Sequence, residues 1–352
     1  MPYKVLQIID KLDIGGAEKI TVLLANLMAE KGHDSGLLTL IDAGKLIENL
    51  DNNAKYINLH RRSKWNINTA INFMQIASNY DLIHIHLCHN LKWVLFWSII
   101  LRKRLNIVFH NHGNTALRWH LLYYIHRCNI SHIIVNKKLY DSQSLIHSFT
   151  TRVYFLGNII NPLLSSGEYV SKEDELVFIV VSNLRRLKNI EFAIKLANYF
   201  AKIKKLTLDI YYVHFEKEYL EELRDLSRNS DIQLDVNFIK GEIEPQLFYH
   251  KYDLALHTSI RESGPLNILE YMAHGLPFIS YNTGQSIKLV REKYPELIVN
   301  TFNLEEWITK LEMILERGRL YYNFPLRDLF SNHNSSDNYY TECKKIYKEN
   351  LA

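Results

Sequence analysis

Residues 261–277 read RESGPLNILEYMAHGLP, and this stretch carries the clearest structural pattern in the chain. Pro265 suits the first turn of a helix, because the N–H that proline lacks would have no partner there. Gly275 and Pro277 predict the helix end, since glycine accepts a left-handed cap and proline cannot continue a helix. Apolar runs at 253–260 and 278–281 predict flanking strands. Strand, loop, helix and strand is the unit of a doubly wound α/β sheet, which binds ligands at the carboxyl ends of its strands.

Two glutamates in this stretch, Glu262 and Glu270, are separated by seven residues. Glu262 falls in the predicted loop and Glu270 on the helix that follows. Free backbone N–H groups and the helix dipole can hold an anion at such a helix start, and a carboxylate accepts hydrogen bonds from hydroxyls. The combination suits a nucleotide-sugar site. Taken alone, two solvated glutamates beside an ordinary amphipathic helix would give the same pattern.

Residues 262–277 resemble the donor-site signature of the retaining glycosyltransferases of family 4, which have the two-domain GT-B fold. Other segments match the family in order, at 4–18, 108–113, 156–162 and 182–189. The resemblance implies an α/β protein with two Rossmann-like doubly wound domains that face each other across a cleft. It implies an acceptor-binding domain at 1–163, a donor-binding domain at 164–330, and a final helix at 331–352 that crosses back to the first domain.

The composition agrees with a soluble two-domain enzyme. The chain has 352 residues, of which 47% are hydrophobic and 23% charged, and this length suggests about two domains. Its cysteines, Cys88, Cys128 and Cys343, are far apart, which favours a reducing compartment and argues against structural zinc. The first residues enter a strand pattern without a signal peptide, so we expect a cytoplasmic protein.

Charge is shared unevenly along the chain. Residues 1–160 hold 18 Lys and Arg against 10 Asp and Glu, a net of +8, whereas the remainder has a net of −4. A basic first domain suggests an anionic partner, such as a phospholipid surface or a lipid-linked phosphate acceptor. No nucleic-acid-binding motif accompanies the charge, so we expect no nucleic acid partner.

Residues 92–104, KWVLFWSIILRKR, join an apolar run to three cations. The run is too short to span a bilayer. It could form an interfacial helix with its tryptophans at headgroup level, or a buried helix of a doubly wound domain. The basic-aromatic residues 61–65 leave the same two choices. The pattern makes peripheral contact with the inner face of the cytoplasmic membrane a possibility to test.

The remaining site residues follow from the resemblance. In the first domain, Gly16 would approach the donor pyrophosphate at a helix N-terminus, and His112 would form hydrogen bonds in the cleft. His84, His86 and His110 also lie near strand ends and are interpreted as structural, not as a metal site. No Asp-x-Asp is present, so we expect no metal ion and no cofactor.

In the second domain, residues 175–182 predict a strand, and Lys188 begins a helix predicted at 188–203. Lys188 would place a positive charge beside the donor diphosphate. The family carries an arginine where this chain has Asn183, and we assign that charge to Arg185 instead. Glu262 would bind donor hydroxyls, and Glu270 would accept both ribose hydroxyls. The phosphate or sugar would be held by backbone groups in the segment Gly264, Pro265 and Leu266.

The sequence therefore predicts a retaining hexosyl- or N-acetylhexosaminyl-transferase. It would move a sugar from a nucleotide-sugar donor to a lipid-linked or saccharide acceptor in bacterial surface polysaccharide assembly, such as O-antigen, capsule or lipopolysaccharide. Glu262, His112 and Lys188 are the predicted catalytic residues. Two alternatives remain open at this point: another GT-B enzyme such as a sugar-nucleotide epimerase or a phosphorylase, and a non-catalytic partner subunit with the same fold.

Overall fold

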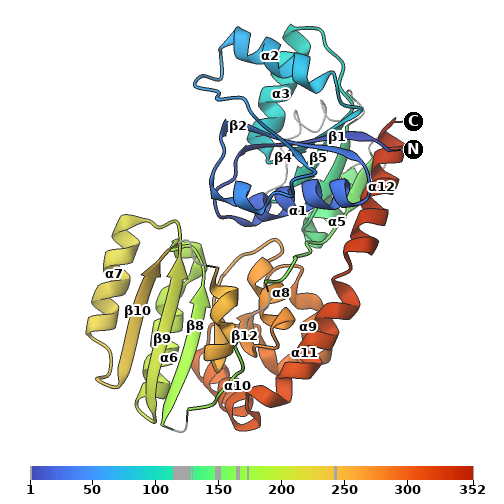
Figure 1. Cartoon of the computed structure of the whole chain (residues 1–352). Coiled ribbons are helices and arrows are strands. Elements are labelled where there is room, and N and C mark those ends of the chain that lie inside the picture. The colour runs from blue at the N-terminus through green and yellow to red at the C-terminus, as the bar shows by residue number, and fades with distance from the viewer. Residues whose placement is uncertain are drawn as a thin grey trace. The chain divides into compact units, whose positions relative to one another are not determined.

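The chain divides into two compact units, each described here by itself. A computed structural model describes residues 2–113, 128, 130–146, 152–163, 167–172, 174–241 and 244–351. The first unit is Met1–Ile160 together with Ser335–Ala352, and the second is Asn161–Asn334. Figure 1 shows the elements of both units. Residue 164, where the sequence analysis begins the second domain, lies outside the described residues.

The first unit contains a seven-stranded sheet in the order β3-β2-β1-β4-β5-β6-β7, with every neighbouring pair parallel. Its strands are β1 (Lys4–Lys11), β2 (Asp34–Asp42), β3 (Lys55–Asn58), β4 (Leu82–His86), β5 (Ile107–Asn111), β6 (Ser131–Ile134) and β7 (Val153–Phe155). Its helices are α1 (Gly16–Glu30), the 3-10 helix η1 (Lys45–Asn49), α2 (Ile67–Ala77), α3 (Cys88–Ile100), α5 (Lys137–Ile146) and α12 (Ser336–Leu351). The connections reverse direction between β1 and β4, which makes that pair the switch point of the sheet.

Alternation along the strands divides this unit into layers. Ile83 and Ile85 of β4 join the apolar core under α2 and α3. Successive side chains of a strand point to opposite faces, so His84 and His86 lie on the face that packs against α1 and α12. Helix α12 is fixed there by Asn350, whose Nδ2 donates to the Ile107 carbonyl at 3.0 Å. The strand sequence thus puts an apolar core on one face and a polar cluster on the other.

The second unit contains a six-stranded sheet in the order β10-β9-β8-β11-β12-β13, again with parallel neighbours. Its strands are β8 (Glu175–Val181), β9 (Lys205–Tyr212), β10 (Leu234–Lys240), β11 (Leu254–His257), β12 (Phe278–Tyr281) and β13 (Ile298–Val299). Its helices are η2 (Arg186–Lys188), α6 (Ile190–Ala201), α7 (Lys217–Arg228), η3 (Pro245–Lys251), α8 (Leu266–Ala273), α9 (Ile287–Lys293), η4 (Pro295–Leu297), α10 (Leu304–Arg317) and α11 (Arg319–His333). Here the connections reverse between β8 and β11. Both units therefore have the doubly wound α/β architecture that the sequence predicts.

The helix predicted from the quoted stretch is present as α8, and Gly275 adopts the predicted left-handed conformation at its end, with φ +59°. A Cβ at Gly275 would lie 2.5 Å from the Asn323 carbonyl oxygen of α11. Pro265 is the N-cap of α8, one residue before the position that the sequence suggests. Glycine is required at 275 both by its backbone conformation and by the close approach of α11.

The helix predicted from Lys188 is displaced. Lys188 ends the 3-10 helix η2, Asn189 has φ +52°, and α6 begins at Ile190. Asparagine tolerates the left-handed region because its side chain can form local hydrogen bonds, so it separates the two helices. The prediction that Lys188 begins a helix at 188–203 is therefore wrong, and Lys188 lies in the loop.

Helix α3 is neither fully buried nor a helix with its tryptophans exposed. Trp93 and Trp97 are buried, and both Nε1 atoms donate to the Lys64 carbonyl, at 3.0 and 3.1 Å. Phe96, Ile99 and Ile100 are exposed instead. None of the helices among the described residues is both long and apolar enough to cross a membrane.

Candidate active site

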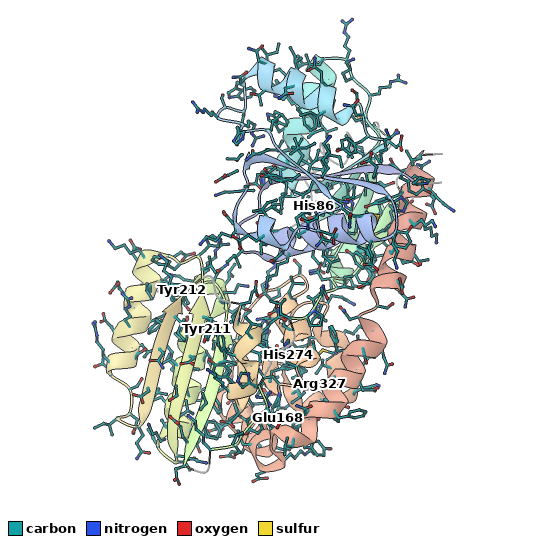
Figure 2. The ribbon with its side chains drawn as sticks, in the orientation of Figure 1. His86, Glu168, Tyr211, Tyr212, His274 and Arg327 are labelled. Carbon is teal, nitrogen blue, oxygen red and sulfur yellow. The ribbon has the colours of Figure 1, made fainter. Side chains whose placement is uncertain are left out.

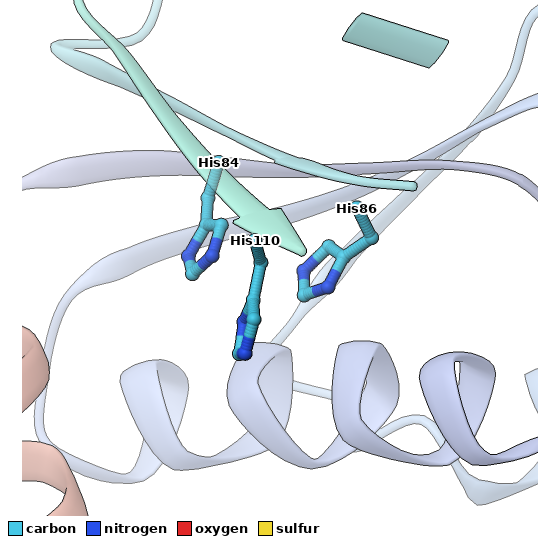
Figure 3. Close-up of side chains that lie close together, drawn as sticks. All are labelled: His84, His86 and His110. Atoms are coloured by element: carbon cyan, nitrogen blue, oxygen red, sulfur yellow. The ribbon is translucent and has the colours of Figure 1, made fainter. Parts of the chain in front are cut away.

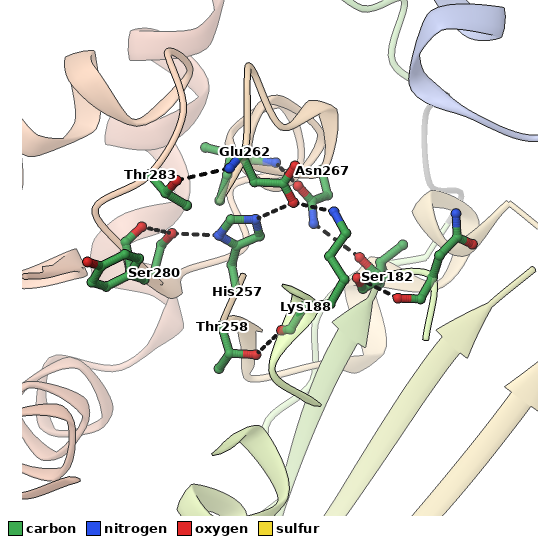
Figure 4. Close-up of polar contacts among 12 residues, drawn as sticks. Ser182, Lys188, His257, Thr258, Glu262, Asn267, Ser280 and Thr283 are labelled. Carbon is green, nitrogen blue, oxygen red and sulfur yellow. Dashed lines mark hydrogen bonds and ion pairs between the residues drawn. The ribbon is translucent and has the colours of Figure 1, made fainter. Parts of the chain in front are cut away.

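The switch point of the second sheet brings together two predicted site residues. Lys188 follows β8 and Glu262 follows β11, and these two strands are parallel neighbours. The Lys188 Nζ donates to Glu262 Oε1 in an ion pair, drawn in Figure 4, and both side chains are largely buried. The Thr258 hydroxyl also donates to the Lys188 carbonyl at 3.0 Å. Side chain and backbone therefore both fix Lys188 against the β11 loop.

Glu262 has a second close neighbour, His257, which the sequence pattern did not single out. His257, the last residue of β11, places Nε2 3.7 Å from Glu262 Oε1, while its Nδ1 lies 2.8 Å from Ser280 Oγ on β12. Burial alone would raise the pKa of Glu262. The close approach of the His257 ring and the charge of Lys188 outweigh the burial and lower that pKa to about 2. Glu262 is thus held as a carboxylate.

The loop that carries Glu262 is braced by the loop after β12. The Glu262 N–H donates to Thr283 Oγ1 at 3.0 Å, and the Gln285 N–H donates to the Ser263 carbonyl at 2.8 Å. Gly284 has φ +85°, and a Cβ there would lie 2.5 Å from Pro265 Cδ. The segment 282–284 follows β12 and borders the same loop. Thr283 and Gly284 do contact this loop, whereas the Asn282 side chain bonds to Asn300 instead.

Helix α8 places the other donor-site residues in sequence along its first turn. Gly264 and Leu266 flank the N-cap Pro265, and the Asn267 side chain donates to the Val181 carbonyl at 3.1 Å, which ties the helix start to the end of β8. One turn later, Glu270 is buried, with its Oε2 accepting a hydrogen bond from the Tyr249 hydroxyl at 3.2 Å. A carboxylate in a hydrogen-bonded, buried setting can orient hydroxyl donors of a ligand.

Asn183, the departure from the family pattern, has a structural task. Its Oδ1 accepts hydrogen bonds from the His214 and Val213 N–H groups, at 3.0 and 3.4 Å, and so joins the loops after β8 and β9. Arg186 forms a bidentate pair with Glu222. Arg185 is exposed, and its guanidinium makes no ion pair within the described part of the chain. Arg185 is therefore the cation of this loop that remains available for an anion.

In the first unit, Gly16 begins α1 directly after β1, at the carboxyl edge of the sheet. The Glu18 carboxylate folds back over this helix start: a Cβ at Gly15 would lie 2.3 Å from Glu18 Oε2. Burial raises the pKa of Glu18 to about 7. At the neighbouring loop, His89 Nε2 pairs with Asp10 Oδ2 at 3.1 Å. The sequence pattern did not indicate that the Glu18 carboxylate would lie at the N-terminus of α1.

His112 lies just after β5, and a chain of hydrogen bonds sets its tautomer. The Gln7 Oε1 lies 2.9 Å from His86 Nε2, and His86 Nδ1 lies 2.9 Å from His112 Nε2. Gln7 Oε1 can only accept, so a neutral His86 carries its proton on Nε2 and accepts on Nδ1. His112 then donates from Nε2. Burial lowers its pKa to about 3, and the neutral ring offers the Nδ1 lone pair to a hydroxyl.

His84 and His86 of β4 and His110 of β5 form a buried cluster (Figure 3). Figure 2 labels His86 within the first unit. One ring nitrogen from each lies within 4.8 Å of the others, a spacing that could suit a metal ion. The His84 ring, however, stacks on the rings of His86 and His110 with interplanar angles of 12° and 20°, and the His86 and His110 rings are tilted by 32°. An imidazole binds a metal along its lone pair, in the ring plane, so stacked rings do not converge on one ion. We describe the cluster as stacked imidazoles.

A cavity of about 390 Å³ lies elsewhere in the second unit, lined by residues that include Val177, Thr207 and Asp209 near the first halves of β8 and β9. None of the predicted site residues lines it. The carboxyl ends of β8 and β11 are favoured as the site because Lys188, His257 and Glu262 lie close together there.

Sequence reasoning missed His257, Ser280 and the link from Gln7 to His112. The available signal was a histidine at the end of the strand that precedes Glu262. Its partners depend on the order of β8, β11 and β12 in the sheet, which no local pattern states.

Comparisons with known proteins identify the family of the chain. The family described as "Glycosyl transferases group 1" matches residues 165–327, and the one described as "Glycosyltransferase Family 4" matches residues 14–139. An uncharacterized glycosyltransferase of Haemophilus influenzae is 23% identical over 87% of this chain and 88% of its own. The N-acetyl-alpha-D-glucosaminyl L-malate synthase of Bacillus anthracis is 24% identical over 77% of each chain.

Solved structures share the fold. A glycosyltransferase from Rickettsia africae superposes with a TM-score of 0.79 at 15% identity and covers 99% of each chain. Anabaena HepE in complex with UDP and glucose gives a TM-score of 0.74 at 14% identity, over 98% of this chain and 99% of its own. The chain therefore belongs to the family 4-type glycosyltransferases, which have the GT-B fold of two Rossmann-like domains.

Proposed function

We propose that this glycosyltransferase moves a hexosyl or N-acetylhexosaminyl group, with retention, from a nucleotide-sugar donor to a lipid-linked or saccharide acceptor in bacterial surface polysaccharide assembly. The observation that carries the proposal is the Lys188–Glu262–His257 group at the switch point of the second sheet. A structural neighbour supports a nucleotide-sugar donor, since HepE was solved in complex with UDP and glucose.

Each residue of the second unit has a role suited to its place. Lys188, with Arg185 in the same loop, supplies the positive charge that a departing diphosphate needs. The N–H groups of Gly264 and Leu266 contact the phosphate or sugar at the start of α8. Glu262, held ionised, accepts hydrogen bonds from donor hydroxyls, and Glu270 accepts from the ribose hydroxyls. In the first unit, Gly16 approaches the pyrophosphate, and His112 accepts a hydrogen bond from a sugar hydroxyl at Nδ1.

Retention is proposed to occur by front-face substitution. The leaving phosphate oxygen accepts the proton of the acceptor hydroxyl as the new glycosidic bond forms on the face that the phosphate leaves. Lysine and arginine neutralise the diphosphate in this scheme, and no metal ion takes part. We expect the transfer rate to be unchanged after chelation with EDTA, and a rate restored only by added Mg²⁺ or Mn²⁺ would contradict this assignment.

The first experiment is a panel of UDP, GDP and ADP sugars screened by thermal shift and then by calorimetry. Glu270→Gln should lose donor affinity by about tenfold or more, because a charge-assisted acceptor becomes a neutral amide. Glu262→Ala should bind the nucleotide as before and mainly lose turnover. Glu296→Gln is the matched control, since Glu296 pairs with Arg317 away from α8.

Two outcomes would redirect the proposal. Unchanged nucleotide binding in Glu270→Gln would remove its assigned role. Failure of the protein to bind any of the sugar nucleotides would favour a non-catalytic partner subunit that keeps the fold.

A further inference from the structure

The outer side of α2 and α3 is an exposed apolar surface, which we name the α2–α3 surface. It consists of Trp65, Ile67, Ile71, Phe96, Ile99 and Ile100, all exposed. Trp65 is 73% exposed, and Ile99 and Ile100 are each 54% exposed. The Trp65 and Phe96 rings meet edge to face at 5.5 Å. These residues therefore form one continuous patch across two helices, which lie together beside the first sheet in Figure 1.

The patch follows the geometry of a helix face. Lys92, Phe96, Ile99 and Ile100 are spaced as i, i+4, i+7 and i+8, so they lie on one side of α3, and the exposed cations Arg102, Lys103 and Arg104 follow the end of the helix. The side of α3 turned away from this stripe carries Leu91 and Val94, which belong to the buried core of the unit. An apolar stripe between cations on the solvent side is the arrangement of a helix that lies in a membrane interface.

The loop before α2 is held in place so that Trp65 stays exposed. The Trp93 and Trp97 indoles both donate to the Lys64 carbonyl, and the Arg61 guanidinium lies 4.8 Å from the centre of the Trp93 ring. Residues on either side of these anchors, Arg62 and Trp65, therefore project from a fixed backbone. A preorganised patch loses less conformational entropy when it binds.

The charge around the α2–α3 surface is almost wholly positive. Between residues 59 and 106, seven Lys and Arg side chains accompany one acidic residue, Asp81. Six of the seven cations are exposed, namely Arg62, Lys64, Lys92, Arg102, Lys103 and Arg104. Asp81 lies at the start of β4, where it accepts a hydrogen bond from the Lys4 N–H at 2.8 Å. Exposed apolar side chains ringed by cations fit a surface that is apolar within and anionic at its edge.

We propose that the α2–α3 surface binds an anionic phospholipid bilayer, with Trp65, Phe96, Ile99 and Ile100 entering the headgroup region and the cations contacting lipid phosphates. This inference rests on the proposed function and deepens it, because a lipid-linked acceptor would lie in a membrane. It also excludes the form of the interfacial helix in which Trp93 and Trp97 reach the headgroups, one of the two choices left by the sequence, since those indoles are buried.

Vesicle co-sedimentation of the full chain tests the proposal without any sugar transfer. We expect binding to vesicles with about one third phosphatidylglycerol and little binding to pure phosphatidylcholine, with affinity falling as salt is raised. Lys103→Gln with Arg104→Gln should lower the partition coefficient by about tenfold or more. Arg102 is left unchanged because its backbone is left-handed, with φ +50°.

An apolar double variant and a matched control complete the design. Phe96→Ser with Ile99→Ser should lower partitioning by about tenfold or more. Leu320→Ser with Phe324→Ser removes two apolar residues of α11 that are 74% and 75% exposed, more than Phe96 and Ile99 are. This variant should leave binding unchanged. Far-UV circular dichroism checks that each variant is folded, and the salt dependence of the unmodified protein tests the idea independently of any variant.

The proposal is overturned if the unmodified protein binds neutral and anionic vesicles equally, or binds neither. It is also overturned if the α11 control loses binding as much as the α3 variant does. A dimer that Phe96→Ser with Ile99→Ser converts to a monomer, without vesicle binding, would assign the surface to a second copy of the chain. No vesicle binding by the unmodified protein, with its transfer to a soluble acceptor intact, would reject this surface and leave the proposed function standing.

Discussion

At the scale of single residues, the ion pair between Lys188 and Glu262 joins side chains 74 positions apart in the sequence. A buried carboxylate is stable only when it is compensated, and here a lysine and a histidine compensate it together. The pair also prepares both groups for a ligand. When the Lys188 ammonium group binds the donor diphosphate instead of Glu262, the Glu262 carboxylate is left to accept hydrogen bonds from sugar hydroxyls. The same change would thus bind both the phosphate and the sugar of the donor.

His112 acts in this account through a tautomer that two buried neighbours set. Gln7→Leu removes the acceptor for His86 Nε2–H and frees His86 to exchange its tautomer. His112 would then present an N–H at Nδ1 in place of a lone pair. We expect kcat to fall by about tenfold or more, with the KM for the donor little changed.

Steady-state kinetics of three variants check this prediction. Gln7→Glu keeps an acceptor at the same place and should retain more turnover than Gln7→Leu. Tyr347→Phe is the control, because its hydroxyl contacts His84 Nδ1 at 2.7 Å and touches Gln7 only at Nε2, at 3.5 Å, so the variant leaves the Gln7 Oε1 acceptor in place. Equal losses in Gln7→Leu and Tyr347→Phe would show that packing, and not the tautomer, matters.

At the scale of elements, the sequence identified most of what positions the second site. The strands after which Lys188 and Glu262 lie, and the helix α8 with its glycine end, could all be predicted because caps, apolar runs and turn residues are local signals. The start of α6 could not, since a single left-handed Asn189 moved it past Lys188. The strand β11 also ends at His257, earlier than residue 260, because the following residues turn to meet Lys188.

Helix α3 shows a different limit of sequence reasoning. Its residues are apolar nearly all round, so no periodicity marks the side that faces solvent. The buried side was decided by the loop at 61–66, whose Lys64 carbonyl takes both indole N–H groups. A contact between segments about 30 positions apart therefore buries the two tryptophans and leaves Phe96, Ile99 and Ile100 exposed to solvent.

The end of α8 gives a stability prediction at this scale. Gly275→Ala places a methyl group in a left-handed conformation and against the Asn323 backbone of α11. Gly318→Ala has a similar positive φ, +74°, but nothing within 4 Å of its Cβ. We expect Gly318→Ala to cost about 1–3 kcal/mol of unfolding free energy, because φ +74° with ψ 161° is a backbone conformation almost restricted to glycine. Gly275→Ala should cost about 2 kcal/mol more, because the overlap must be relieved by moving backbone.

Urea unfolding of the two variants, measured side by side, separates backbone conformation from overlap. Donor affinity should also fall in Gly275→Ala, since α8 carries Glu270, and stay unchanged in Gly318→Ala. Equal unfolding free energies in the two variants would mean that α11 yields to the methyl group without loss.

At the scale of the whole molecule, the two units repeat one plan with different chemistry at the switch points. In the second, a lysine, a histidine and two glutamates gather after β8 and β11. In the first, the residues after β1, β4 and β5 include Gly16, the Asp10–His89 pair and His112. The second unit thus holds the groups suited to a charged leaving group, and the first holds neutral imidazoles suited to hydroxyls.

The stacked imidazoles of the first unit predict an acid-sensitive fold. Burial lowers the pKa of His84 and of His112 to about 3, and lowers those of His86 and His110 well below the ordinary value. The unfolded chain binds protons on these residues below its pKa of about 6.5, and the folded chain does not. Stability is therefore fully present above that pH and is lost as the pH falls from about 6.5 toward 3. Between pH 7 and pH 5 the loss should be about 2 kcal/mol for each of His84 and His112.

Urea unfolding at pH 7, 6 and 5, followed by tryptophan fluorescence in a Trp307→Phe background, reports this loss, because Trp307 belongs to the second unit. His110→Leu should reduce the slope by about 1.4 kcal/mol per pH unit, since neither ring nitrogen of His110 has a hydrogen-bond partner among the described residues. His60→Asn is the control, because His60 is exposed and asparagine suits its left-handed backbone, with φ +49°.

Glu262 loses its contribution to the unfolding free energy only below about pH 4.5, toward its folded pKa of about 2, so it does not affect stability between pH 7 and pH 5. A flat stability between pH 7 and pH 5 would mean that the imidazoles accept protons in the folded protein.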